Sequence, residues 1–118
     1  MISQLPLSEF AEWRDASAEA GILPIVLDVR EPWEVQTASV RPDGFTFLAI
    51  PMREVPGRMA ELQAIHGEGA AIGCLCHHGM RSLQVATYLA QNGFTGVVNL
   101  QGGIDAWSQQ VDAGVPRY

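Results

Sequence analysis

Residues 70–83 read AAIGCLCHHGMRSL, and this stretch decides the fold of the chain. Its first six residues are small or apolar and uncharged, which is typical of a strand buried on both faces of a parallel sheet. From Arg81 to Gln91 apolar residues recur at helical spacing, and Asn92-Gly93 is a usual signal for a helix C-terminus. The stretch therefore predicts a strand, a tight loop and a helix, with Cys76 in the loop.

Cys76 would lie just before the first turn of that helix. The first backbone N–H groups of a helix have no partner inside the helix, so they favour a nearby anion. Arg81 stands five residues after Cys76 and adds positive charge. Both effects would stabilise a thiolate, which is the nucleophilic form of cysteine. We predict that Cys76 is a catalytic nucleophile, provided that solvent reaches it; the alternative is an inert, packed cysteine.

Other segments extend this pattern along the chain. Apolar, β-rich runs at residues 24–29, 45–50 and 97–100 predict further strands, and a short strand is expected near residues 2–4. Residues 55–65 favour a helix. Strands that alternate with helices predict an α/β class with a parallel sheet.

Three motifs resemble those of the rhodanese-like sulfurtransferases, in the order and approximate spacing of that family. They are LDVRE at residues 27–31, CHHGMRS at residues 76–82 and VNLQGGIDAW at residues 98–107. In that family the loop cysteine takes a sulfane sulfur from a donor, becomes a persulfide and passes the sulfur to an acceptor. The resemblance implies a five-stranded parallel sheet with helices on both faces. It covers nearly the whole chain, so we expect one rhodanese-like domain over residues 1–118.

The loop that follows Cys76 is expected to bind the donor. The residues concerned are His77, His78, Gly79, Met80, Arg81 and Ser82. Gly79 would let the loop turn without a side chain in the way. The N–H groups of residues 77–82 and the helix dipole would hold the negative persulfide, and Arg81 would offset charge on the donor or leaving group. His77 and His78 are equally compatible with solvated loop positions.

Asp28 and Arg30 stand where the predicted strand 24–29 ends. In parallel sheets the carboxyl ends of the strands line the ligand crevice. By resemblance, both residues lie near the catalytic loop. We expect Arg30 to pair with an acidic group and Asp28 to accept hydrogen bonds from loop N–H groups, so that both support the loop. The alternative is an exposed ion pair with no role.

Some positions point to structure rather than chemistry. Residues 38–44 read ASVRPDG where the family usually has a Gly-His pair, an apolar residue and Gly-Ala. We interpret this as structural variation, because the cysteine loop is intact. Trp33 is expected to pack at a helix start, with contact to the substrate as the alternative, and Gly102-Gly103 is expected to serve the fold. Cys74 is expected in the core, because a bond to Cys76 would close almost no loop; a resolving thiol is the alternative.

Charge and hydropathy limit the kinds of partner that we expect the chain to bind. The net charge of −6, with no basic run, argues against nucleic acid or an anionic membrane as partner. No apolar run approaches the roughly 18 residues of a membrane span, and no secretion signal is evident, which makes the cytoplasm the default expectation. We expect a monomer without cofactor or metal. A thiosulfate-like anion would be the donor, and the acceptor would be cyanide or a thiol, which includes the thiol of a protein.

Three other functions stay open. Phosphotyrosine-type phosphatases and some arsenate reductases also set a cysteine before a helix, but their loop holds one residue more than the four between Cys76 and Arg81. Zinc is a second alternative, because Cys74, Cys76 and the two adjacent histidines are ligand types, although a second group of ligands is missing. The third is a carrier that only holds a persulfide on Cys76 for a partner.

Overall fold

The computed structural model describes residues 2–18, 22–66 and 69–118. Five strands form one sheet in the order β1-β5-β4-β2-β3, and every neighbouring pair is parallel. The strands are β1 (Ser3–Pro6), β2 (Ile25–Asp28), β3 (Thr46–Ala49), β4 (Ala71–Leu75) and β5 (Gly96–Gln101). This confirms the predicted α/β class and its five-stranded parallel sheet.

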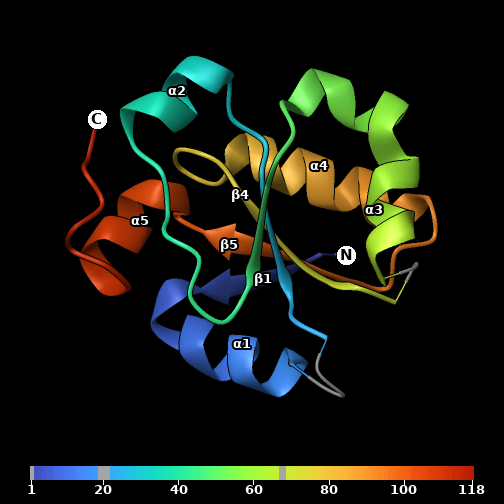
Figure 1. Ribbon diagram of the computed structural model, residues 1–118, viewed down its shortest axis with the longest axis horizontal. Coiled ribbons are helices and arrows are strands. Elements are labelled where there is room, and N and C mark those ends of the chain that lie inside the picture. The colour runs from blue at the N-terminus through green and yellow to red at the C-terminus, as the bar shows by residue number, and fades with distance from the viewer. Residues whose placement is uncertain (1, 19–21, 67–68) are drawn as a thin grey trace.

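Helices cover both faces of this sheet (Figure 1). They are α1 (Phe10–Ser17), α2 (Pro32–Thr37), α3 (Met59–His66), α4 (Met80–Gln91) and α5 (Gly103–Gln110). Two 3-10 helices precede α1 and α3, namely η1 (Leu7–Glu9) and η2 (Met52–Arg58). The helix expected over residues 55–65 thus begins in 3-10 form. Pro56 lies inside η2, where it has no N–H to donate to a helical bond.

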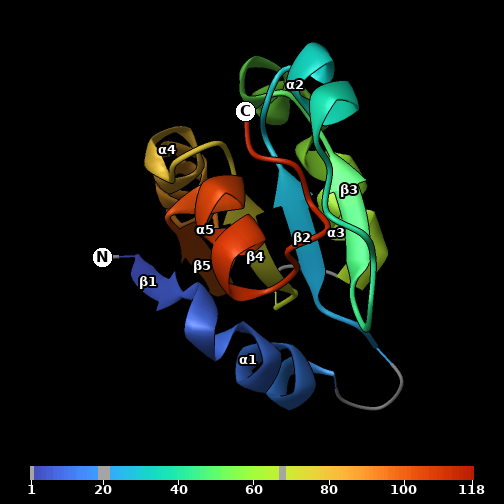
Figure 2. The ribbon, with the colours of Figure 1, turned by 90° about the vertical axis from the view of Figure 1, so that its left-hand side faces the viewer.

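The alternation of side chains along the strands divides the core into two clusters. Ile25 and Leu27 of β2 belong to the cluster beneath α3 and α4, which also contains Cys74 and Cys76. Val26, between them, belongs to the second cluster beneath α1 and α5. Figure 2 shows α5 and α1 in front of the sheet and α3 behind it. Successive side chains along a strand are therefore buried on opposite faces of the sheet, as the apolar strands predicted.

The register of the central strands brings the predicted motifs together at the carboxyl ends of these strands. Leu27 of β2 lies opposite Cys74 of β4, and Cys74 lies opposite Asn99 of β5. Beyond β2, the Val29 N–H still donates to the Leu75 carbonyl at 2.9 Å. The loop that begins at Cys76 therefore lies between the end of β2 and the turn that follows β5.

One packing prediction is wrong. Trp33, in the first turn of α2, keeps 63% of its surface exposed instead of packing at the helix start. The first turn of α2 is instead secured by a capping box, in which the Glu31 N–H donates to Glu34 Oε1 at 3.0 Å. Within residues 2–18, 22–66 and 69–118, none of the helices has the length and apolar character needed to cross a membrane.

Candidate active site

Cys76 follows β4 directly, and the backbone of its loop turns back onto its sulfur. The Gly79 N–H donates to Cys76 Sγ at 3.0 Å, and Ser82 Oγ lies 3.3 Å from the same sulfur. Gly79 precedes α4 with φ of +106°, a conformation that L residues rarely adopt. The sulfur is thus held at the N-terminus of a twelve-residue helix, where backbone N–H groups and the helix dipole favour an anion.

The first turn of α5 binds the other side of this loop. The Ile104 N–H donates to the Cys76 carbonyl at 2.8 Å, and the Asp105 N–H donates to the His77 carbonyl at 3.2 Å. Gly103 has φ of +62°, and a Cβ there would overlap both carbonyl oxygens. The loop carbonyls are therefore bound on the side away from the sulfur. The Gly102-Gly103 motif, which we expected to serve the fold, also positions the catalytic loop.

Asn99 of β5 orients Ser82 beneath the sulfur. Asn99 Nδ2 donates to the Gly79 carbonyl at 3.1 Å, and because a carbonyl only accepts, Oδ1 faces Ser82. Ser82 Oγ lies 2.6 Å from Oδ1 and gives its single proton to that oxygen. Its lone pairs are then left to face Cys76. Sequence reasoning missed Asn99, although a buried amide inside the apolar strand 97–100 is a usable signal.

The two cysteines differ in their surroundings. Cys74 is fully buried, and burial, followed by the nearby charge of Cys76, raises the pKa of its thiol. This agrees with its expected place in the core. Cys76 is also only 1% exposed, so the requirement that solvent reach it is not met in this conformation. Part of that burial comes from its backbone, whose carbonyl accepts from the Ile104 N–H of α5.

Arg81 does not stand free beside the sulfur. Its guanidinium forms two bonds to Glu34, Nη1 to Oε1 at 2.6 Å and Nη2 to Oε2 at 2.9 Å. Glu34 is 4% exposed, and hydrogen bonds from Arg81, from Tyr118 and from the Glu31 N–H lower its pKa to about 2 against the opposing effect of burial. The expected free cation is therefore already neutralised by a buried carboxylate.

Asp28 and Arg30 form a fully buried ion pair, with Arg30 Nη2 2.6 Å from Asp28 Oδ2. The expectation that Arg30 pairs with an acid is confirmed, and the alternative of an exposed pair is wrong. The hydrogen bonds found at Asp28 differ from those expected, and its support of the loop stays a prediction. Among the described residues, its carboxylate accepts hydrogen bonds from the backbone and side chain of Arg30 and from no N–H of the cysteine loop.

Tyr118, the last residue of the sequence, connects this pair to the loop. Its hydroxyl donates to Glu34 Oε2 at 2.7 Å and accepts from Arg30 Nη1 at 2.9 Å. Figures 1 and 2 both place this end of the chain beside α2. No local pattern around Tyr118 marks it as a site residue, and the sequence did not predict it.

The ring of Tyr118 also packs on the loop histidines. It stacks on His77 with a centroid distance of 4.0 Å, and His77 stacks on His78 at 3.9 Å. His77 is half-buried and His78 exposed, so the solvated alternative fits only His78. Trp33 meets Tyr118 edge-on, with the ring centroids 6.3 Å apart. The four rings make an aromatic row, His78–His77–Tyr118–Trp33, along the rim of the loop.

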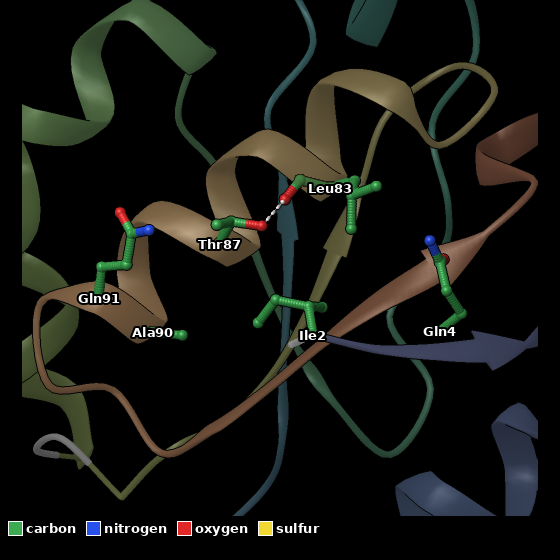
Figure 3. A pocket seen from close by; sticks show the side chains of 6 residues that line it. All are labelled: Ile2, Gln4, Leu83, Thr87, Ala90 and Gln91. Carbon is green, nitrogen blue, oxygen red and sulfur yellow. Dashed lines mark hydrogen bonds between the residues drawn. The ribbon is translucent and has the colours of Figure 1, made fainter.

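A surface hollow of about 580 Å³ lies away from this rim, between β1 and α4. Figure 3 shows its lining residues, Ile2, Gln4, Leu83, Thr87, Ala90 and Gln91. It approaches the site through Gln4, whose Oε1 accepts from Asn99 Nδ2 at 2.8 Å. Within the part of the chain that the structure describes, no three His, Cys, Asp or Glu side chains are grouped to hold a metal ion.

The fold and the loop together define a class of protein: a parallel α/β sheet with a cysteine at a strand-to-helix turn. The model of the rhodanese-like domain matches residues 8–110, and the chain belongs to that family. The family resemblance of the three sequence motifs is thereby confirmed.

Individual relatives agree with this assignment. The chain is 36% identical over 93 residues to the chloroplastic rhodanese-like/PpiC domain-containing protein 12 of Arabidopsis thaliana, matching 79% of this chain and 30% of that protein. It is 35% identical over 85 residues to a protein named sulfurtransferase from Allochromatium vinosum, matching 72% of each chain. The crystal structure of SSP1007 from Staphylococcus saprophyticus superposes with a TM-score of 0.72 at 26% identity, covering 98% of this chain and 99% of that one. The chain thus spans less than a third of the plant protein's length.

Proposed function

We propose that the chain is a sulfurtransferase that moves a sulfane sulfur from thiosulfate, or from another anionic or persulfide donor, through a persulfide on Cys76. The acceptor would be cyanide or a thiol. The observation that carries the proposal is the position of Cys76 Sγ, which accepts the Gly79 N–H at the start of α4 and faces Ser82. Membership of the rhodanese-like family supports the same chemistry.

The reaction would proceed in two displacements. The Cys76 thiolate attacks the outer sulfur of the donor, forming a new S–S bond. The bond between that sulfur and the rest of the donor breaks, and its electron pair leaves with the donor fragment, as sulfite from thiosulfate or as a thiolate from a persulfide. An acceptor nucleophile then attacks the outer sulfur of the Cys76 persulfide and restores the thiolate. Loop N–H groups and the dipole of α4 would stabilise the negative sulfur in both states.

A phosphatase is disfavoured by the pairing of Arg81. An enzyme that holds a phosphate dianion in such a loop needs its guanidinium free to bind two oxygens. Here both terminal nitrogens of Arg81 are bound to Glu34. The loop is also one residue shorter than the phosphatase loop.

The test is the mass of the protein after treatment with thiosulfate. We expect a gain of one sulfur in the wild type and none in Cys76→Ser, while Cys74→Ser keeps the gain. Continuous turnover with thiosulfate and cyanide supports an enzyme. A persulfide that forms once and leaves only to a protein thiol supports a carrier instead. Sulfur uptake that survives in Cys76→Ser contradicts the proposal.

A further inference from the structure

The cation of the catalytic loop is paired with a buried carboxylate, and this bears on which donors the loop accepts. The site contains two ion pairs, Arg30 with Asp28 and Arg81 with Glu34, so its four charges cancel. What remains for an incoming anion is the partial charge at the start of α4, equivalent to about half a unit charge. Thiosulfate brings two negative charges, whereas a thiol persulfide brings one or none.

Arg81 cannot turn to a donor without a cost. Glu34 is 4% exposed, and losing Arg81 would leave its carboxylate buried and unpaired by a cation. Two further donors fix that carboxylate in place, the Glu31 N–H on Oε1 and the Tyr118 hydroxyl on Oε2. The low pKa of Glu34 keeps the group charged throughout the neutral range.

The rim of the loop also favours an organic donor. Met80, the first residue of α4, is 71% exposed, and Trp33 is 63% exposed. Trp33 joins the loop through the aromatic row that includes Tyr118 and His77. Exposed apolar and aromatic side chains match the carbon skeleton of a thiol persulfide better than the charged oxygens of a sulfonate group.

From this geometry we propose that Glu34 and Tyr118 are specificity-determining positioning residues, which hold Arg81 neutralised so that the loop selects low-charge thiol persulfides over the thiosulfate dianion. This inference rests on the proposed sulfur transfer through Cys76. The step is the same displacement as above: the Cys76 thiolate attacks the outer sulfur of the persulfide, and the thiol fragment leaves with the electron pair as a thiolate.

The experiment compares second-order rates of Cys76 persulfidation by thiosulfate and by cysteine persulfide, read by intact mass. In Glu34→Gln, Arg81 keeps a neutral partner and regains its net charge. We expect the ratio of the thiosulfate rate to the persulfide rate to rise by about tenfold, and the thiosulfate rate to become sensitive to added salt. Tyr118→Phe keeps the ring on His77 but removes the hydroxyl, and should shift the ratio less, in the same direction.

Glu31→Gln is the matched control. It removes one negative charge three residues before Glu34 and keeps the backbone N–H that bonds Glu34 Oε1, while the Glu31 carboxylate pairs with exposed Arg53 and not with Arg81. The ratio should stay at the wild-type value. An equal rise in both Gln variants would mean that general charge sets the preference, and would overturn the role of Glu34.

The outcomes separate this inference from the function on which it rests. A wild type that takes sulfur from neither donor overturns the sulfurtransferase proposal itself. A wild type that takes sulfur, with an unchanged ratio in folded Glu34→Gln, overturns only the specificity role. If Glu34→Gln does not fold, Tyr118→Phe decides: a ratio and salt response identical to the wild type overturn the inference.

Discussion

At the scale of single residues, the two cysteines of β4 and its loop should react differently. Cys74 lies wholly in the core and its thiol pKa is raised by burial, whereas Cys76 Sγ accepts a backbone N–H at the start of α4. We expect iodoacetamide to modify Cys76 in the folded protein and Cys74 only after denaturation. Peptide mass spectrometry locates the label. Folded protein that resists labelling at Cys76 would mean that its sulfur stays sealed, and the proposed chemistry would then have no nucleophile.

Ser82 links the sulfur to the sheet, and its removal should affect both stability and chemistry. In Ser82→Ala, Asn99 Oδ1 loses its donor in a buried site, and Sγ loses a neighbour 3.3 Å away. We expect a loss of about 1–3 kcal/mol in the free energy of unfolding and, because Ser82 no longer ties the start of α4 to Asn99, a roughly tenfold slower sulfur uptake. Urea unfolding and intact mass measure the two effects.

Ser108→Ala is the control for that variant. Ser108 is also a buried serine, but its hydroxyl donates to the Ile104 carbonyl within α5 and does not touch the sulfur. It should lose stability without slowing sulfur uptake. Equal slowing in both variants would mean that Ser82 acts through general stability alone.

At the scale of elements, the contact between α5 and the cysteine loop depends on one glycine. In Gly103→Ala the added Cβ meets the carbonyl oxygens of Cys76 and His77, in a backbone conformation that disfavours L residues. We expect a loss of at least about 2 kcal/mol in the free energy of unfolding, together with loss of sulfur uptake. Gly57→Ala, where nothing lies within 4 Å of the added Cβ and φ is not positive, should keep both. If Gly103→Ala is as stable and active as wild type, α5 does not position the loop.

Neighbouring residues in the sequence predict the elements of this fold better than they predict the contacts between elements. The strand, loop and helix at residues 70–91 follow from apolar runs, glycines and a stop signal close together in the chain, and the structure confirms β4 and α4 there. The expectation for Arg81 could not anticipate Glu34, because a bond across 47 residues depends on which side α2 faces. Tyr118 lies 84 residues from Glu34, and no pattern near it indicates a role. Asn99 falls between these cases, since its polarity stands out within an apolar strand.

At the scale of the whole molecule, the ion pair of Glu34 and Arg81 should make stability depend on acid pH. The pKa of Glu34 falls from an ordinary 4.5 to about 2 in the folded chain. A depressed folded pKa adds stability that is complete above the unfolded value and is lost as pH falls through the folded one. The contribution should therefore be full above about pH 5 and vanish near pH 2, with a size of about 3 kcal/mol.

The measurement is urea unfolding of the wild type and Glu34→Gln from pH 7 down to about pH 2. We expect the wild type to be the more stable at neutral pH and the difference to shrink steadily as acid is added. Glu61→Gln serves as control, because Glu61 pairs with Arg58 on the exposed face of a helix, where solvent screens the attraction between the two charges. Its difference from wild type should stay small at every pH. A wild-type advantage over Glu34→Gln that persists unchanged to pH 2 would show that Glu34 contributes through packing and not through its charge. The loop would then owe its geometry to contacts other than the buried ion pair.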